Sequence, residues 1–478
     1  MVRLGKRLPV WLGVTAAFMV FVDSTIVNVA LPQLQVDLGA SRSELEWVIN
    51  AYTLTFAAMM LGAGAAADAI GAKRVFLLGL TVFTVTSLGC ALSGTAMALN
   101  LWRLFQGAGA ALMLPSALSL ATRNVSDERE RHRVVGLWAA AGGIGLAAGP
   151  LLGGLLVRAA GWPSVFWINV VVGVAAVAVG AAALPATAGH ERRLDVAGQT
   201  AATAAIAGLV FALIEAPVRG WSDPAVLAAV GIMVLGVAGF VVAERRTESP
   251  LLPAGVYRDR TFLGSGAQGA LFNFAFYGLL FALSLLLQQQ RGLDALGAGL
   301  SFLPLTGMVA VGNLSAPRLA ARIGRPRVLL AGQVLLTLSL AAVAFTGGLA
   351  VSWPLLLALA PAGFSSGLLV PTMTSQTLTT VETALHGAAS AAFNTSRQLG
   401  AAVGVATFGP LLGIGLGLRD GFTVCILLAA AGTVVAGVLT VLTQLPSRSG
   451  DAPSAASPQD QSPQDLSPKS LEPGRVVG

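Results

Sequence analysis

The segment Gln106-Gly-Ala-Gly-Ala-Ala-Leu-Met-Leu-Pro-Ser116 has a near copy later in the chain, Ala362-Gly-Phe-Ser-Ser-Gly-Leu-Leu-Val-Pro-Thr372, with a glycine and a proline at matching places. The loop Asp68-Ala-Ile-Gly-Ala-Lys-Arg74 resembles Ala321-Arg-Ile-Gly-Arg-Pro-Arg327 at nearly the same separation. Two further glycine pairs keep that separation: Gly145 with Gly400, and Gly149 with Gly404. Matches at nearly one separation predict two related halves, a plan that many membrane transporters build around a central cavity.

The composition requires a lipid environment. Of the 478 residues, 55% are hydrophobic and 11% are charged, and the mean hydropathy is +0.77. Soluble domains carry about 25% charged residues, so this chain cannot build their polar surface. Long apolar runs predict membrane-spanning helices, which satisfy their own backbone hydrogen bonds in lipid. We therefore expect an all-α integral membrane protein embedded in a lipid bilayer.

Apolar runs of spanning length recur along the chain, and each crossing needs roughly 20 residues. The repeat pairs the second, fourth and fifth runs with the tenth, twelfth and thirteenth, so two extra helices lie between two six-helix bundles. The fourteen predicted spans are 8–31, 47–68, 75–96, 99–122, 134–157, 163–184, 196–217, 223–243, 262–287, 296–320, 328–349, 354–378, 387–413 and 420–444.

These spans predict four parts. Residues 1–190 form an N-terminal six-helix bundle, residues 191–250 form the two-helix insert, and residues 251–445 form a C-terminal six-helix bundle. Residues 446–478 are rich in Pro, Ser, Gln and Asp. Such a composition cannot bury apolar surface, so this tail is expected to be disordered.

The basic residues predict the orientation. The net charge of +7 comes largely from Lys and Arg in alternate gaps between spans, which places both termini in the cytoplasm and predicts no nucleic-acid partner. The run after Arg7 is too long for a signal peptide and is interpreted as the first membrane helix. The abundance of Ala and Gly is typical of GC-rich bacterial genomes, so the expected location is a bacterial cytoplasmic membrane, crossed many times.

Ionisable side chains occur inside two spans. Asp23 begins Asp23-Ser-Thr-Ile-Val-Asn-Val-Ala-Leu-Pro32 in the first span, and Arg103 begins Arg103-Leu-Phe-Gln106-Gly-Ala-Gly109 in the fourth. A charge at the bilayer centre costs about 2.5–3.5 kcal/mol on insertion scales, so it normally faces a cavity or a partner. At about 1.5 Å per residue, both lie in the outer half of the membrane. We expect them to pair, directly or through Gln106 or water, either for proton coupling or as a static ion pair.

Two glycine motifs follow a span or lie within one. Gly64-x-x-x-Asp68-x-x-Gly71-x-Lys73-Arg74 begins at the end of the second span and predicts a tight turn in a basic, topology-setting loop. Small residues four apart let helix backbones touch, and proline kinks a helix. The fifth span has this pattern, in Gly145-x-x-x-Gly149-Pro150-x-x-Gly153-Gly154.

Further polar residues lie within the spans and are candidates to line a substrate cavity: Asn28, Gln106, Asn273 and Arg397. The two cysteines, Cys90 and Cys425, lie in apolar runs, so no disulfide framework is expected. No metal-ligand cluster, nucleophile constellation or Gly-Lys-Ser/Thr phosphate loop occurs in the sequence. The sequence thus predicts no metal, no cofactor and no catalytic residue.

The motifs resemble those of the major facilitator superfamily, specifically its fourteen-helix drug–proton antiporter family, over nearly all of the chain except the tail. The resemblance implies a major facilitator fold and a monomeric transporter with the proton as coupling ion. It also implies that Asp23 carries the proton, that Arg103 tunes it, that the loop after the second span is a gate, and that the fifth-span motif is an antiporter signature. Ala69 and Ala72 depart from the family's basic residues, so its full charge relay is not expected.

The expected function is export of small hydrophobic or cationic drug-like compounds from the cytoplasm by alternating access. A self-resistance exporter of one antibiotic, a proton-coupled uptake symporter and a non-transporting receptor remain alternatives. The exporter-type fifth-span motif argues against the symporter.

Overall fold

The computed structural model describes residues 2–444 except 124, 126, 188–194, 248–258, 350–352, 382–385 and 414–416. The predicted disordered tail, 446–478, lies outside the described residues. The two boundaries expected for the insert, at 190/191 and 250/251, also lie outside them. The regular structure in the described ranges is helical throughout, as expected for an all-α protein.

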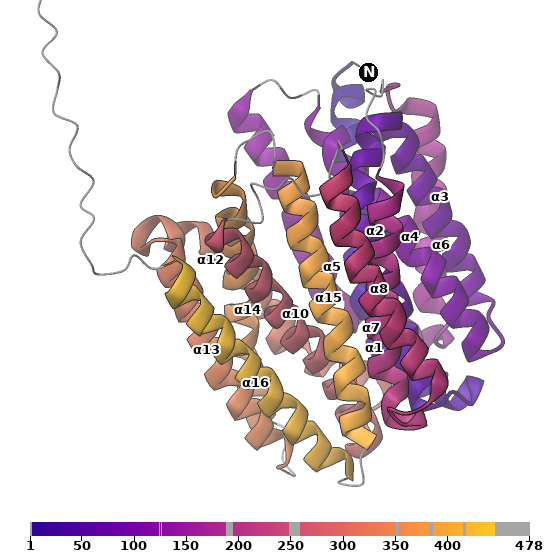
Figure 1. Cartoon of the computed structure of the whole chain (residues 1–478), viewed down its shortest axis with the longest axis vertical. Helices are drawn as coiled ribbons and strands as arrows, with labels where there is room; N and C mark the ends of the chain where they lie inside the picture. The colour runs from indigo at the N-terminus through magenta and orange to yellow at the C-terminus, as the bar shows by residue number, and fades with distance from the viewer. Residues whose placement is uncertain are drawn as a thin grey trace, which may run out of the picture. The chain divides into compact units, whose positions relative to one another are not determined.

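The helices fall into three groups along the chain (Figure 1). The N-terminal half consists of α1 (Val2–Leu38), α2 (Arg42–Ile70), α3 (Ala72–Ala91), α4 (Ala96–Thr122), α5 (Glu128–Ala160) and α6 (Ser164–Ala183). The insert consists of α7 (Val196–Arg219) and α8 (Pro224–Arg246). The C-terminal half consists of α10 (Arg260–Leu285), the π-helical turn η1 (Leu286–Gln290), α11 (Ala295–Ser301), α12 (Leu303–Ile323), α13 (Arg325–Gly347), α14 (Trp353–Thr379), α15 (His386–Gly413) and α16 (Gly417–Gln444).

The part of the chain that the structure describes has fewer candidate membrane spans than the fourteen predicted. Among the described residues, 12 helices are long and apolar enough to cross a membrane, or 13 if α2, bent by 54° near Gly62, is one span. The missing span is α15, whose polar run Asn394-Thr-Ser-Arg-Gln398 lowers its hydropathy. The predicted span 296–320 is divided between α11 and α12, where Pro304 at the start of α12 has no N–H to continue the helix.

The two halves repeat the same packing. In the N-terminal half α1 packs on α5, α2 on α4, and α3 on α4 and α6; in the C-terminal half α10 packs on α15, α12 on α14, and α13 on α14 and α16. The repeated glycines explain part of this. Gly107 of α4 lies against the backbone of Tyr52 in α2, and Gly363 of α14 lies against the backbone of Leu305 in α12, with no room for a side chain at either glycine. The internal repeat predicted from the sequence is therefore confirmed.

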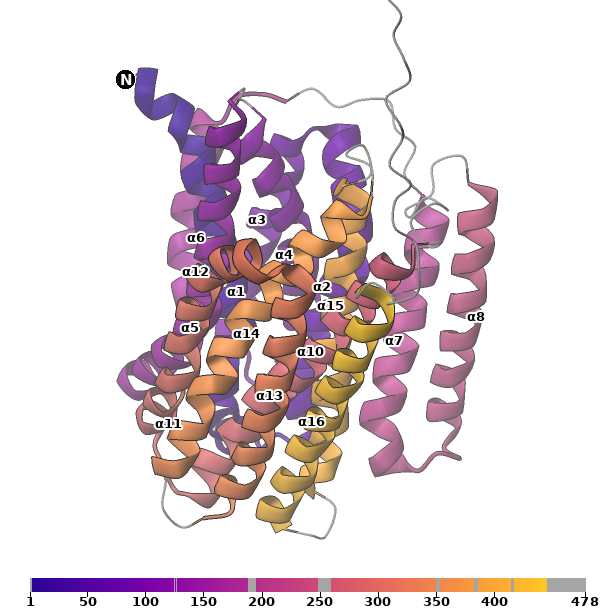
Figure 2. The ribbon, with the colours of Figure 1, turned by 90° about the vertical axis from the view of Figure 1, so that its left-hand side faces the viewer.

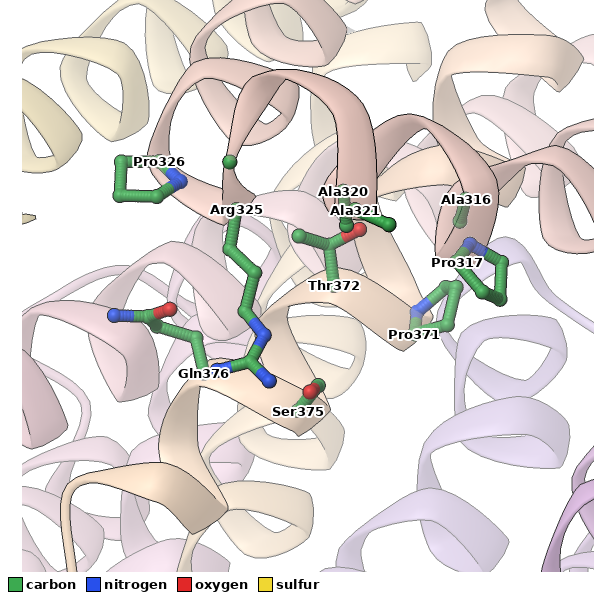
Figure 3. A pocket seen from close by; sticks show the side chains of 11 residues that line it. Ala316, Pro317, Ala320, Ala321, Arg325, Pro326, Pro371, Thr372, Ser375 and Gln376 are labelled. Carbon is green, nitrogen blue, oxygen red and sulfur yellow. The ribbon is translucent and has the colours of Figure 1, made fainter.

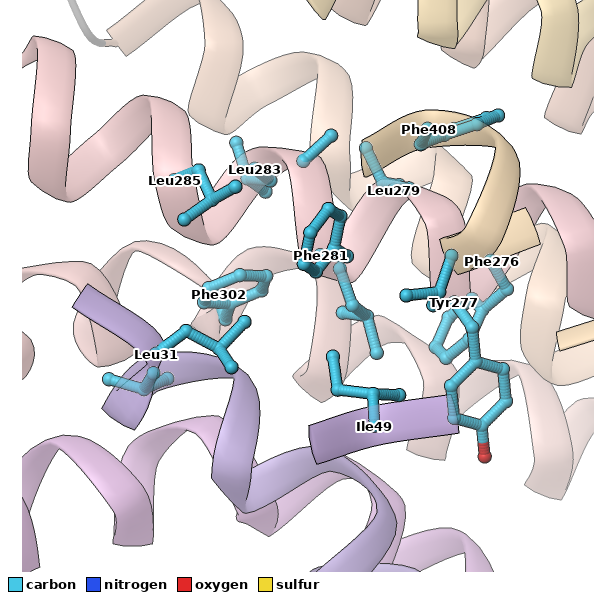
Figure 4. Packing of buried hydrophobic residues seen from close by; sticks show 14 of the residues in the cluster. Leu31, Ile49, Phe276, Tyr277, Leu279, Phe281, Leu283, Leu285, Phe302 and Phe408 are labelled. Atoms are coloured by element: carbon cyan, nitrogen blue, oxygen red, sulfur yellow. The ribbon is translucent and has the colours of Figure 1, made fainter. Parts of the chain in front are cut away.

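The halves join at the end of the molecule where α1 ends, which we call the closed end. A continuous apolar cluster there includes Leu31 and Ile49 from the N-terminal half and Phe281 and Phe302 from the C-terminal half (Figure 4). Ser284 Oγ donates to the Asn28 carbonyl at 2.6 Å. Toward the opposite end, each half has apolar clusters of its own.

The insert is attached beside this junction. Helices α7 and α8 pack on each other, and α7 also packs on α2 and α15 (Figure 2). Glu215 of α7 accepts hydrogen bonds from Ser43 Oγ at 2.9 Å and Trp47 Nε1 at 3.1 Å, both on α2. At the bend of α2, Gln199 of α7 donates to the Ala58 carbonyl. The insert thus holds α2 at two separated points.

Candidate functional site

The predicted pair on α1 and α4 is present as a direct ion pair. Arg103 Nη1 lies 2.5 Å from Asp23 Oδ2, and the two side chains are 1% and 0% exposed. The packing of α4 on both α1 and α2 holds the two side chains together. The geometric prediction that these residues pair is therefore confirmed, and their role in coupling stays a prediction.

Two amides complete the surroundings of Asp23. Asn169 Nδ2 of α6 donates to Asp23 Oδ1 at 2.7 Å, and Gln106 Nε2 donates to the same oxygen at 3.0 Å. Gln106 Oε1 accepts from Arg103 Nη1 at 2.7 Å, while Gln106 Nε2 also reaches Ser87 Oγ at 2.8 Å. Charge-assisted hydrogen bonds of this kind are about twice as strong as neutral ones. The network therefore satisfies a charged carboxylate in a dry environment.

Arg103 is fixed by further contacts. Its Nε donates to the Val48 carbonyl at 2.9 Å, and its guanidinium carbon lies 4.3 Å from the ring centre of Tyr52. A guanidinium keeps its proton in proteins, so Asp23 is the member of the pair that can change charge. Both side chains are buried, so in this arrangement of the helices Asp23 has no contact with solvent.

The four residues predicted to line a cavity lie in different parts of the structure. Gln106 belongs to the Asp23 network, and Asn28 is 2% exposed on α1 with its amide donating to the Thr25 carbonyl at 3.1 Å. In the C-terminal half, Arg397 Nε donates to Asn273 Oδ1 at 3.4 Å. The structure thus brings Asn273 and Arg397 together, and brings Gln106 to Asp23.

The loop after α2 forms the predicted tight turn. Gly71 has φ +96°, a conformation that favours glycine. Lys73 Nζ donates to the Leu184 carbonyl at 2.6 Å, which fastens the turn to the end of α6. Asp68 and Arg74 are exposed, and the space around Gly64 is open, so a close helix contact at Gly64 is not observed.

The fifth-span motif lies between the halves. Gly145, Gly149 and Gly153 lie against α1, near Phe18, Thr25 and Ile26 respectively. On the other side of α5, Gly154 lies against Ala295 and Leu296 of α11, and the carbonyl of Pro150 faces Gly299. The motif therefore lets α5 touch both its own half and the C-terminal half at the closed end.

A cavity of about 560 Å³ lies elsewhere, between the end of α12, the start of α13 and the end of α14 (Figure 3). Arg325, Pro371, Thr372 and Gln376 are among the residues that line it. All of its lining residues belong to the C-terminal half. It is therefore a different place from the central cavity expected between the halves.

Asn169 and Glu46 are among the buried polar residues that the sequence reasoning missed. Asn169 is an amide in the otherwise apolar α6, and that isolation was the available signal. Glu46 lies one residue before the predicted second span, 47–68, and was not considered as a membrane residue. The helix begins at Arg42, after a capping box in which Ser41 and Glu44 satisfy each other's backbone N–H groups. The Ser-x-x-Glu pattern could have given this start.

The comparisons with known proteins agree with this architecture. A family model described as the Major Facilitator Superfamily matches residues 13–405. The human organic anion transporter MFSD10 superposes with a TM-score of 0.64 at 17% sequence identity, covering 91% of this chain and 99% of that one. This likeness supports the fold. The chain belongs to the major facilitator superfamily and is a membrane transporter, not an enzyme.

Among individual relatives, the chain is similar to proteins named for antibiotic resistance. It is 36% identical over 437 residues to the methylenomycin A resistance protein of Bacillus subtilis (strain 168), which covers 91% of this chain and 94% of that protein. It is 35% identical over 419 residues to the tetracenomycin C resistance and export protein of Streptomyces glaucescens, which covers 85% of this chain and 76% of that protein.

Proposed function

We propose that this transporter is a proton-coupled antiporter that exports small hydrophobic or cationic drugs or antibiotics from the cytoplasm. The observation that carries the proposal is the buried Asp23–Arg103 ion pair with its amide donors. An ionisable residue inside a membrane bundle marks an ion pathway. The relatives named as resistance and export proteins support the direction and the substrate class.

The proposed orientation follows the positive-inside rule, with both termini in the cytoplasm of a bacterium and the closed end facing outward. In that orientation, the structure has its halves sealed on the outer side (Figure 4). The bundles 1–190 and 251–445 would rock about a midplane site to open the outer side, with the insert 191–250 travelling with α2. An inward-facing exporter with a charged Asp23 is ready to take up a substrate from the cytoplasm.

The exchange uses the permanent charge of Arg103. In the outward-facing state a proton from outside binds Asp23 and weakens its attachment to Arg103. Each proton that crosses a 100 mV potential supplies about 2.3 kcal/mol, before any pH gradient is counted. The proton is the coupling ion, and this mechanism involves no other cofactor and a single chain.

A self-resistance exporter of one antibiotic is the second candidate, because the names of several relatives carry a single antibiotic. A drug-susceptibility panel in an efflux-deficient bacterial host separates the two. Protection against many unrelated compounds supports the broad exporter, and protection against one compound class supports self-resistance.

Transport in inside-out vesicles tests the coupling. We expect an acid interior to drive drug accumulation by the wild-type protein, and Asp23→Asn to abolish it because the amide cannot carry the proton. Asp37→Asn, which changes an exposed carboxyl at the end of α1, should transport normally. An Asp23→Asn protein that still pumps against a gradient would contradict the coupling role, and drug loss on acidification would instead indicate an uptake symporter.

A further inference from the structure

Helices α2 and α15 form a seam between the two halves at the closed end. The helices run antiparallel: Arg42 of α2 faces Gly413 of α15, Glu46 faces Gly409, and Thr395 donates to the Ala57 carbonyl at 3.2 Å. Each glycine leaves room for the longer side chain opposite it. The seam is therefore closely packed along several turns of both helices.

Glu46 is a buried carboxyl without the partners that a charge needs. It is 2% exposed, and its Oε2 is buried without a hydrogen-bond partner among the residues that the structure describes. Asn50, one turn further along α2, is also fully buried, with neither its oxygen nor its nitrogen paired. An unpaired charged carboxylate in such a place is very costly, whereas the neutral acid is tolerated.

No cation forms an ion pair with Glu46 among the residues that the structure describes. Arg42, one turn away on the same helix, acts on Glu46 as an opposite charge, but it forms no ion pair with it and its effect is smaller than that of burial. Arg103 is committed to Asp23 and the Val48 carbonyl. From α7, the like-charged Glu215 acts on Glu46, and Arg219 is engaged by Glu215 at 2.8 Å. The Gly409 backbone occupies the space beside the carboxyl, so a proton is the ligand that fits.

We propose that Glu46 is a second proton-binding site, protonated while the α2–α15 seam is closed and ionised when the seam opens to water. The proton comes from the aqueous phase on that side, forms an O–H bond with a Glu46 oxygen, and returns to water on opening. This inference rests on the proposed function for its direction: acid outside favours closing of the outer seam. It assigns Glu46 a role separate from that of Asp23, because no hydrogen bond joins the Glu46 carboxyl to Asp23, Arg103 or Gln106 among the described residues.

The test measures the opening of the seam in the full-length protein reconstituted in lipid. Spin labels on Met97→Cys of α4 and Val424→Cys of α16, exposed positions in opposite halves, report the separation of the halves over a pH series. The native thiols Cys90 and Cys425 are buried and should not be labelled. We expect alkaline pH to increase the open, long-distance population in the wild-type background, and Glu46→Gln to abolish that increase.

Controls separate this inference from the proposed function. Asp37→Asn, an exposed carboxyl at the same end, should keep the wild-type pH response. Glu46→Met, a neutral side chain of similar length, should behave as Glu46→Gln and guards against misfolding of one variant. Drug export by the wild-type protein in the same vesicles reports the proposed function independently. A seam that responds to pH equally with and without the Glu46 carboxyl, or not at all in the wild type, overturns the inference.

Discussion

Breaking the buried ion pair between Asp23 and Arg103 would cost a large amount of free energy. Removing one member of a buried ion pair typically costs 3–5 kcal/mol, because the remaining charge is left uncompensated. In this protein the pair is supplemented by two amides and a backbone carbonyl. The arrangement is therefore stable in one charge state and sensitive to a change in it, as a site that responds to protonation requires.

Asn169 is expected to contribute to transport because it donates a hydrogen bond to Asp23. We expect Asn169→Ala to destabilise the protein by about 1.5–3 kcal/mol, the value of a hydrogen bond to a charged group, and to reduce proton-driven drug transport. Thermal unfolding in detergent and vesicle transport are the measurements. Asn100→Ala is the matched control, because Asn100 donates to the Glu44 backbone and not to Asp23. Equal effects of both variants on transport would contradict a role for Asn169 at the Asp23 site.

The sequence predicted the ion pair at this site but not all of the residues that surround it. The pairing of Asp23 with Arg103 followed from their depth along two spans, since an intramembrane charge needs a partner. The contributions of Asn169 and Ser87 come from other helices, and linear spacing does not reveal which face of α3 meets α4 or which face of α6 meets α1. Glu46 was missed for a local reason, the misplaced start of α2.

The helices approach each other most closely where glycine removes the side chain. We expect Gly107→Val to destabilise the protein by about 1–3 kcal/mol, the usual cost of overpacking, because the Tyr52 backbone occupies the space. Gly363→Val should have a similar effect in the C-terminal half, against Leu305. Gly136→Ala, where nothing lies within 4 Å of an added Cβ, should leave thermal stability unchanged or slightly raised. Tolerance of valine at both repeated positions would contradict the observed close contacts.

The packing of the insert against the two halves was not predictable from the sequence. The repeat predicted that two helices interrupt the symmetry, but not which helix they would contact. The attachment to α2 depends on Glu215 and Gln199, two polar residues at opposite ends of α7. Their partners are an indole and a backbone carbonyl, which no sequence pattern of α7 alone would identify.

At the scale of the whole molecule, the closed end should open for transport to occur. Arg158 of α5 and Asp294, just before α11, form an ion pair at 3.4 Å across the halves, and both side chains are more than half exposed. We expect a short, cleavable thiol crosslinker between Arg158→Cys and Asp294→Cys to stop drug transport, and cleavage to restore it. Each single-cysteine variant treated in the same way should retain activity. Continued transport by the crosslinked protein would show that this end does not separate.

The permanent charge of Arg103 has an electrical consequence for the proposed exchange. If only Asp23 changes charge in that pair, as proposed, each turnover at this site would move a single proton inward. Exchange of that proton for a neutral compound moves net charge and polarises the vesicle membrane. Exchange of the proton for a monovalent cation moves no net charge. A voltage-sensitive dye would therefore distinguish the two kinds of cargo without any chemical analysis of what was carried.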